Sequence, residues 1–528
     1  MSQKVMILGL DGATWKLLGK WILDNRLPTF GKFVHSGSKA ILASTIPSIT
    51  SSALTSLFTG MNPGNHGVLS IINADGSPYT LTEIEQPKIW NIMDKHARRS
   101  CIVGVRGTYP PEKIDGVMIS GTAPSDECIY VYPESLQSRL KNFKNSKVEK
   151  EISELQEKKR KTEHRKKLFD LLVKQTRQRY EIFKRLNQNE EYDFSLLWIE
   201  ETDILQHCCW EYEDLLFQFY AEIDDILSDI MTNFSNRELF VVSDHGFEAK
   251  PQKFFYVNTW LQRQGKLRQK PWPPVHRFIS FFQHFAYRYL EPALETKILS
   301  LVGRFYSSKG NLDVDGARCG IDKIENFPGI DKQHSQAYLS TLFGISMKAG
   351  DRVKDEIIEK LQKIRDEDGK EVIKGVWKRE EVFTGRYLKD IPDIIFLASE
   401  RYLPFPSLTK NLFGDIGRKV YWWRSGEHYL AREGILIACG QTLRRNYDLG
   451  SVNIEDITPT ILHLIGCRIP RQIDGRVVKR IFRKGSDPAM REVLFENQID
   501  ETQSVERPRL SREDTEKIRE RLKQLGYL

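Results

Sequence analysis

Apolar and polar positions follow one another along the chain in blocks that predict buried β-strands separated by helices. Four short apolar runs are typical of strands buried on both faces of a sheet: Val5–Leu10, Ser195–Ile199, Leu239–Val242 and Gly434–Ala438. Asp393–Leu397 is a fifth candidate strand. Apolar residues recur at helical spacing between them, as in Asp224–Phe234 and Val353–Ile364. This alternation predicts an α/β fold with a mostly parallel central sheet and helices on both faces.

Two segments interrupt the alternation. Residues 141–190 have apolar residues at helical spacing among many charges, with 16 Lys or Arg against 7 Asp or Glu between Lys141 and Arg185. We expect one or two long inserted helices that present either a solvated face or an anion-attracting surface. Residues 263–330 are rich in aromatic and basic residues. They could pack on the core, form a lid, or contact a membrane surface through residues 275–306.

These blocks predict a core that is interrupted by insertions. The expected parts are core segments at 1–140, 191–262 and 386–480, a charged helical insertion at 141–190, an insertion or cap at 263–385, and a C-terminal helical tail at 481–528.

The composition narrows the class of protein. The chain has 528 residues, of which 40% are hydrophobic and 28% charged, as expected for a soluble globular protein rather than a disordered, collagen-like or polytopic membrane protein. Seven scattered cysteines argue against a disulfide framework and a zinc ribbon. The net charge of +8 is concentrated in residues 141–185, so a nucleic-acid partner is not expected. The N-terminus lacks a signal-peptide pattern, which favours a cytoplasmic location. The oligomeric state cannot be inferred from these features.

Acidic and imidazole side chains follow three of the predicted strands. Asp11 follows the first strand, Asp203 follows the second, and Asp244 and His245 follow the third. Ligands of open α/β sheets bind beyond the carboxyl ends of the strands, so these side chains should meet at one edge. Crowded carboxylates raise one another's pKa, and a divalent cation would remove that cost. Oxygen and imidazole ligands suit zinc, manganese or iron more than calcium.

Two further histidines could join them. His207 lies four residues after Asp203, so both would face the same side of a helix. His428 lies just before the predicted strand Gly434–Ala438 and could also reach the edge of the sheet.

The stretch Ser44–Gly67 is dense in hydroxyl groups, and within it Pro47 precedes the helix-like run Ser51–Phe58. A helix N-terminus presents free N–H groups and the positive end of the helix dipole. A hydroxyl at this position could bind a metal, lose its proton and act as a nucleophile. Thr50 or Ser51 could equally serve only as an N-cap.

These residues match motifs of a known family in the same order. The motifs are a threonine nine residues before Thr59-Gly60, a D-x-x-x-H at Asp203, a D-H-G at Asp244, and the late His428 before a strand. The chain resembles the alkaline phosphatase superfamily, and within it the type I phosphodiesterase and nucleotide pyrophosphatase branch, which includes prokaryotic members predicted to be phosphohydrolases or phosphomutases. The resemblance runs along the whole chain and is weakest over residues 263–330.

The resemblance implies a two-metal hydrolase with Thr50 as its nucleophile. The implied ligands are Asp11, Thr50, Asp244 and His245 at one site, and Asp203, His207 and His428 at the other. Zinc is the favoured metal and manganese the alternative. The implied reaction is hydrolysis of small-molecule phosphodiesters or nucleotide pyrophosphates through a covalent phosphothreonine.

Some features depart from this pattern or leave other functions open. The phosphate-contacting asparagine of characterised members falls on Ile71 here, and Asn73 is a candidate substitute. A phosphomonoesterase or phosphomutase on the same core is an alternative, with Arg106 or Lys250 as a contact to the additional phosphate oxygen. A catalytically degenerate binding protein at a membrane surface is another. The cysteine or serine motif of sulfatases is absent from the sequence.

Overall fold

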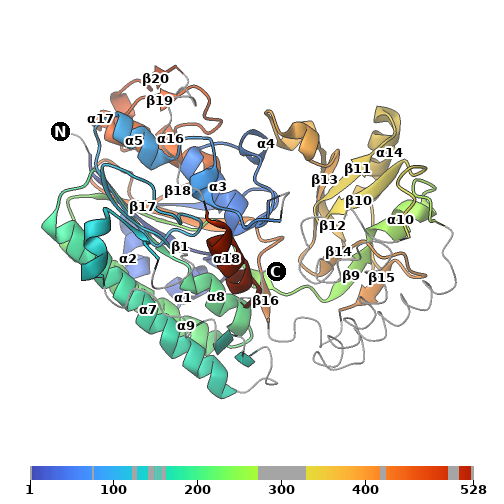
Figure 1. The fold of residues 1–528 in the computed structure, drawn as a ribbon, viewed down its shortest axis with the longest axis horizontal. Coiled ribbons are helices and arrows are strands. Elements are labelled where there is room, and N and C mark those ends of the chain that lie inside the picture. The colour runs from blue at the N-terminus through green and yellow to red at the C-terminus, as the bar shows by residue number, and fades with distance from the viewer. Residues whose placement is uncertain are drawn as a thin grey trace. The chain divides into compact units, whose positions relative to one another are not determined.

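The structure is a computed structural model that describes residues 3–497 and 510–524, except 74–75, 122–127, 141–147, 149–150, 153, 156–161, 271–328 and 417–423. These residues divide into two compact units. The first unit consists mainly of residues 1–154, 160–248 and 426–524, and the second mainly of residues 249–425. Each unit has its own sheets (Figure 1).

The first unit is built on one large sheet of strands that are buried along most of their length. Among the described residues its spatial order is β18 (Tyr447–Asn453), β2 (Ser38–Ala43), β17 (Glu433–Cys439), β7 (Glu238–Val242), β1 (Val5–Leu10), β6 (Phe194–Ile199), β3 (Ser100–Val103), β4 (Gly116–Ile119) and β5 (Val131–Tyr132). The predicted α/β fold with a mostly parallel sheet is therefore confirmed.

Strand direction determines which residues reach the same edge. β1 lies between β6 and β7 and is parallel to both, with Val5 opposite Phe194 on one side and Glu238 on the other. β17 runs antiparallel to β7 and to β2. The residues that follow β1, β6 and β7 and the residues that precede β17 therefore emerge at one edge of the sheet.

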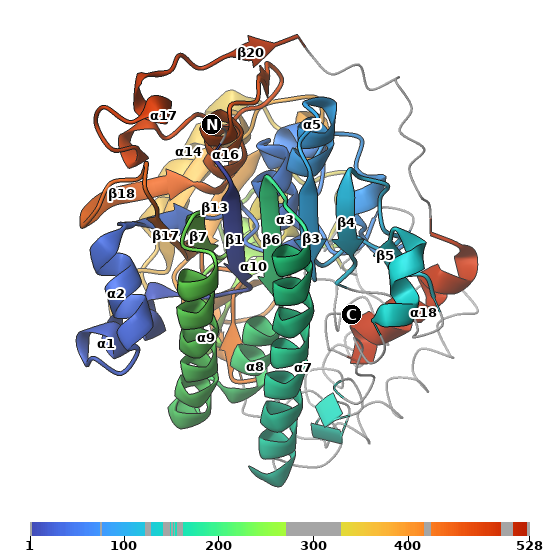
Figure 2. The same ribbon diagram turned by 90° about the vertical axis from the view of Figure 1, so that its left-hand side faces the viewer.

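Helices cover both faces of this sheet (Figures 1 and 2). One face carries α1 (Trp15–Leu23), α2 (Pro28–Ser36), α7 (Thr162–Asn189), α8 (Glu201–Cys209) and α9 (Glu213–Asn233). The other carries α3 (Thr50–Thr59), α5 (Ile89–Lys95) and α16 (Ile457–Ile465). Buried aliphatic and aromatic side chains fill the space between the second helix layer and the sheet, including Phe58, Trp90 and Trp198.

Shorter elements complete the first unit. They are α4 (Pro63–His66), η1 (Leu81–Glu83), η2 (Glu134–Arg139), β16 (Gly426–Glu427), η4 (Ile454–Asp456), β19 (Ile469–Pro470), η5 (Lys479–Ile481), α17 (Asp487–Met490), β20 (Phe495–Glu496) and the C-terminal helix α18 (Arg512–Gln524). β8 (Glu248–Ala249) spans the boundary between the units.

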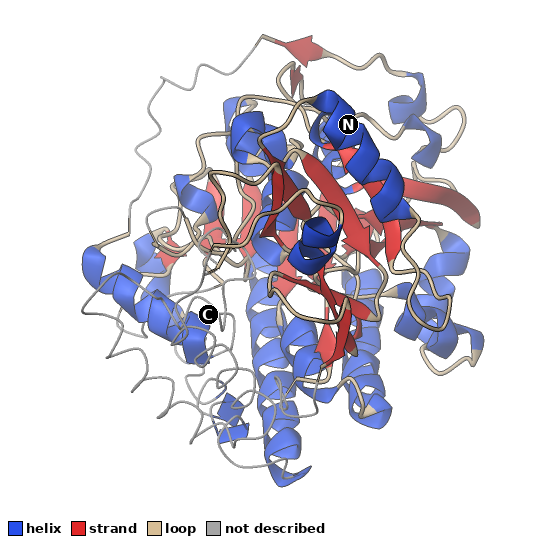
Figure 3. Cartoon of the chain, turned by 90° about the vertical axis from the view of Figure 1, so that its right-hand side faces the viewer, coloured by secondary structure: helices blue, strands red, loops and turns tan. Residues whose placement is uncertain are grey.

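The second unit contains an antiparallel sheet of order β10 (Ala337–Thr341), β11 (Gly344–Met347), β13 (Ile394–Ala398) and β12 (Ile373–Lys378). A smaller sheet joins β14 (Tyr402–Phe405), β9 (Lys253–Tyr256) and β15 (Phe413–Asp415). The helices are α10 (Val257–Arg263), α14 (Asp351–Gln362), α15 (Arg379–Val382) and η3 (Leu388–Asp390). Figure 3 distinguishes these strands and helices by colour.

The fifth candidate strand was assigned to the wrong sheet. Asp393–Leu397 corresponds to β13, which pairs with β11 and β12 in the second unit and not with the central sheet. Residues 386–425, which were predicted to belong to the core segment 386–480, lie in the second unit. A short apolar run indicates burial but does not identify the strands that will pair with it.

The membrane-contact prediction for residues 275–306 lies outside the described residues. Among the residues that the structure describes, no helix is both long enough and apolar enough to cross a membrane.

Candidate active site

Asp11, Asp244 and His245 form the first group of potential metal ligands, called the first ligand group below, at the carboxyl ends of β1 and β7. All three side chains are fully buried. His245 Nε2 lies 3.5 Å from Asp11 Oδ1 and 3.3 Å from Asp244 Oδ2. The two strands are adjacent and parallel, which is why residues more than two hundred positions apart meet here.

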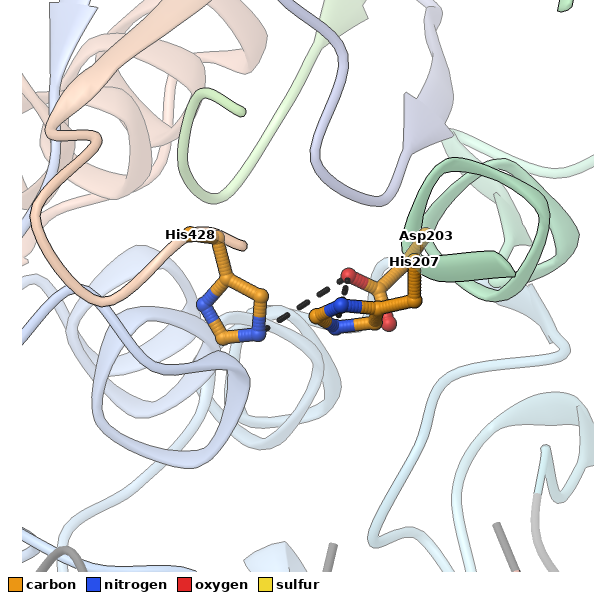
Figure 4. Close-up of side chains that lie close together, drawn as sticks. All are labelled: Asp203, His207 and His428. Carbon is orange, nitrogen blue, oxygen red and sulfur yellow. Dashed lines mark ion pairs between the residues drawn. The ribbon is translucent and has the colours of Figure 1, made fainter. Parts of the chain in front are cut away.

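Asp203, His207 and His428 form the second ligand group (Figure 4). Asp203 and His207 lie on α8, as the four-residue spacing predicted, and His207 Nε2 is 3.4 Å from Asp203 Oδ1. His428 precedes β17, and its Nε2 is 3.9 Å from the same oxygen. One potential ligand atom from each residue lies within 4.8 Å of the other two, a spacing that suits a single cation.

Thr50 connects the two groups to the N-terminus of α3. Its Oγ1 lies 3.3 Å from His245 Nε2, and the rings of His245 and His428 are stacked with centroids 4.0 Å apart. Thr50 is the first residue of α3, and the N-cap is Ile49, which makes no side-chain capping bond. The N-cap alternative for Thr50 is therefore wrong, and its hydroxyl faces the buried cluster instead.

Backbone carbonyls determine which nitrogen of each histidine faces the carboxylates. Nδ1 of His207, His245 and His428 lies 2.9–3.0 Å from the carbonyl oxygens of Gly426, Gly246 and Ser48, respectively. A carbonyl oxygen can only accept, so Nδ1 carries the proton and donates it in each case. Nε2 then keeps its lone pair and is available to a metal.

The electrostatics of the site favour a cation. Burial, together with the charges of Asp244 and Asp203, raises the pKa of Asp11 well above its usual range. Burial also raises the pKa of Asp244. Within the described part of the chain, Asp11 Oδ1 and Asp244 Oδ2 accept no hydrogen bond, although both are buried. Buried carboxylate oxygens without donors are expected where a positive ion supplies the missing interaction.

The protonation state of the imidazoles also favours metal binding. Burial and the nearby His245 lower the pKa of His428 well below its ordinary value, so the ring is neutral at neutral pH. Neutral imidazole is the form that binds a metal. The donor set of carboxylates, imidazoles and one hydroxyl therefore fits divalent metal ions.

Several supporting contacts were not anticipated from the sequence. The Trp198 indole donates to Asp11 Oδ2 at 3.3 Å, and the Gly12 N–H donates to Asp244 Oδ1 at 3.1 Å. A Cβ at Gly9 would lie 2.0 Å from the Trp198 ring. A glycine inside a strand often marks a site where another group packs closely against the backbone. Gly9 was therefore the sequence feature that could have indicated a large side chain at this point of β1.

Three other residues were predicted to contact a substrate phosphate. Asn73 is exposed, and its amide donates to Ser77 Oγ at 3.0 Å within its own turn. Among the described residues, no contact joins Asn73 to either ligand group. Arg106 follows β3, and its Nε donates to Glu200 Oε2 at 3.2 Å. Lys250 belongs to the second unit.

The sequence profile described as type I phosphodiesterase / nucleotide pyrophosphatase matches residues 5–418. The chain belongs to this family. It is therefore a hydrolase that acts on phosphoric ester bonds, and the family is metal-dependent. The match includes six of the seven predicted ligands, Thr50 among them, and ends ten residues before His428.

Other comparisons add little to the family assignment. No curated protein sequence matches this chain. Murine and human ectonucleotide pyrophosphatase/phosphodiesterase 5 each show 15% identity and a TM-score of 0.44, covering 88% of this chain and 95% of theirs. The same values hold for an inactive variant of the murine protein in complex with AMP.

Proposed function

We propose that this chain hydrolyses phosphodiesters or nucleotide pyrophosphates through a covalent phosphothreonine at Thr50, with two bound divalent ions. The observation that carries the proposal is the position of Thr50 Oγ1. It lies 3.3 Å from His245 Nε2, at the start of a helix and beside two groups of potential metal ligands. A hydroxyl in this position lies at an anion-binding helix end and within reach of a cation that these groups would hold.

Thr50 acts as the nucleophile in the proposed reaction. Its Oγ forms a bond to phosphorus while the bond from phosphorus to the leaving oxygen breaks. A water molecule then hydrolyses the phosphothreonine, which releases the phosphate product and restores the hydroxyl. N–H groups in the first turn of α3 have no partner within the helix and would bind a phosphoryl oxygen during both steps.

The two ligand groups would hold the ions. Asp11, Asp244 and His245, with Thr50, fit one ion, and Asp203, His207 and His428 fit the other. Bound divalent ions would supply positive charge that favours the alkoxide form of Thr50 and neutralises the leaving oxygen. Mixed oxygen and imidazole donors favour zinc, with manganese as the alternative.

Replacement of Thr50 tests this assignment. We expect Thr50→Ala to reduce turnover of a p-nitrophenyl phosphodiester by roughly 10⁴-fold or more, because the nucleophile is lost. Metal content measured by elemental analysis should persist, because six carboxylate and imidazole ligands remain. Thr50→Ser should retain measurable turnover.

Ser51→Ala is the matched control, since Ser51 lies on the same helical turn but donates to the Ser70 carbonyl at 3.0 Å. Near wild-type turnover in Thr50→Ala would contradict the proposed nucleophile. The same assay with p-nitrophenyl phosphate separates the alternatives: faster hydrolysis of the monoester would favour a phosphomonoesterase or a phosphomutase.

A further inference from the structure

The charged helix α7 packs along α8, the helix that carries two predicted metal ligands (Figure 2). Two arginines of α7 are buried although the helix is otherwise rich in exposed charge. Arg165 is 3% exposed and Arg179 is 2% exposed. They lie fourteen residues apart, close to four helical turns, and so share one face of the helix.

Arg179 binds the start of α8. Its Nη1 donates to the Trp198 carbonyl at 3.0 Å and to Glu201 Oε2 at 3.1 Å. Its Nη2 lies 3.1 Å from Glu201 Oε1 and 3.2 Å from Glu200 Oε1. One guanidinium group therefore joins the end of β6 to two buried carboxylates that lie two and three residues before the predicted ligand Asp203.

Arg165 binds the other end of α8. Its Nε donates to the Cys208 carbonyl at 3.2 Å. A cation at the C-terminus of a helix interacts favourably with the helix dipole. Both ends of α8 are thus held by α7, and the predicted ligands Asp203 and His207 lie between these two contacts.

We propose that Arg179, assisted by Arg165, is a positioning residue that fixes α8 so that Asp203 and His207 meet His428 in the geometry needed for a divalent ion. Arg179 does not touch the predicted metal and acts through Glu201, Glu200 and the Trp198 carbonyl. The charged insertion would then contribute to the metal site. This inference rests on the proposed function.

Two physical effects support an arginine in this role. Glu200 and Glu201 are buried next to each other, and the charge of Glu200 raises the pKa of Glu201. Arg106 pairs with Glu200, whereas Arg179 places positive charge beside both carboxylates. The planar guanidinium also donates to Glu201 Oε2, Glu200 Oε1 and the Trp198 carbonyl at the same time. A lysine ammonium is a point charge and cannot reproduce this fork.

Metal binding to the full chain, stripped of metal and titrated with Co²⁺ or Zn²⁺, tests the proposal. We expect Arg179→Met and Arg179→Lys to weaken binding at the second ligand group by roughly 10- to 100-fold, as for other residues that orient metal ligands. Asp203→Asn identifies which step of the titration belongs to that group. In the Arg179 variants, the visible spectrum of the Co²⁺ protein should also change, and kcat should fall by a larger factor than KM rises.

Arg177→Met is the matched control. Arg177 lies two residues away on α7, is exposed and pairs with Glu222 on α9, so metal affinity should stay within about twofold of wild type. Because Arg179→Met leaves Glu201 buried without its guanidinium partner and could prevent folding, Arg179→Lys and Arg179→Met/Glu201→Gln are measured in parallel, with circular dichroism to verify folding.

The outcomes separate two failures. If the wild-type protein binds two ions and folded Arg179 variants bind them with unchanged affinity and spectrum, the positioning role is overturned and the proposed function stands. If the wild-type protein binds no divalent ion, the proposed function and this inference both fail.

Discussion

At the scale of single residues, buried carboxylates distinguish a potential metal site from an ordinary hydrophobic core. Asp11 and Asp244 are buried next to imidazoles and to each other, so a bound cation can offset the cost of their charge. Glu455 is also largely shielded from water but lies outside both ligand groups. Burial, together with the charges of Asp456 and Asp474, raises the pKa of Glu455 to about 7.

The raised pKa of Glu455 predicts a pH-dependent effect on stability. Because the folded-state pKa exceeds the unfolded value of 4.5, the stabilising contribution is present below about pH 4.5 and is lost as the pH rises through 7. Glu455→Gln should therefore raise the thermal midpoint relative to wild type at pH 8 and have little effect at pH 5. Thermal unfolding across this range measures the difference. Glu520→Gln on exposed α18 is the control, and equal shifts in both variants would contradict the prediction.

At the scale of elements, the position of Thr50 depends on how helix α3 begins and ends. Gly60 ends α3 in the left-handed region with φ of 70°. Its carbonyl accepts the N–H groups of Asp474 and Gly475 at 3.1 and 2.9 Å. The Asp474 carboxylate in turn accepts from the side chains of Asn62 and Asn65 at 2.8–2.9 Å. Two segments separated by about four hundred residues therefore anchor the far end of the helix that begins at Thr50.

Gly60→Ala should destabilise the protein for two reasons. A left-handed conformation costs a residue with a Cβ about 1–2 kcal/mol. The new Cβ would also lie 2.8 Å from a methyl group of Ile473, which adds about 1–3 kcal/mol of overpacking. Chemical denaturation measures the sum.

Gly485→Ala is the matched control for Gly60→Ala, because Gly485 has a similar φ of 78° but no heavy atom within 4 Å of its added Cβ. Its destabilisation measures the cost of the left-handed backbone conformation alone. A cost at Gly60 no larger than at Gly485 would show that the neighbouring Ile473 can move aside freely.

At the scale of the whole molecule, the predicted metal ligands come from segments near the beginning, middle and end of the chain, and all of them lie in the first unit. Metal binding by these residues would therefore stabilise the fold of that unit. A metal ion that binds only the folded state stabilises it by about 2.7 kcal/mol when the free ion is present at one hundred times its dissociation constant.

Chelation should therefore lower the thermal midpoint of the wild-type protein. Asp244→Asn should show a smaller metal-dependent gain, because one ligand charge is lost. In the metal-free state this variant should be more stable than wild type, since burial raises the pKa of Asp244 and its charge is costly without a cation. Differential scanning calorimetry with and without chelator tests both effects. Asp170→Asn, on the exposed face of α7, should behave as wild type in both conditions.

Local sequence patterns determined the main elements and much of the site. Apolar runs identified β1, β6, β7 and β17 because burial on both faces of a sheet requires continuous hydrophobicity. Strand-end positions and the four-residue spacing predicted that Asp203 and His207 would share a helix face. These features are readable because each depends on residues that are close in sequence.

Only the tertiary structure decided which elements became neighbours. His428 reaches the edge of the sheet where the other predicted ligands lie because β17 runs antiparallel to β7. No local sequence pattern predicts that direction. The fifth candidate strand pairs in the second unit for the same reason: hydrophobicity encodes burial but not the pairing partner. The contacts of Arg179 with Glu201 and of Trp198 with Asp11 depend on packing between distant segments, so the chain order alone could not reveal them.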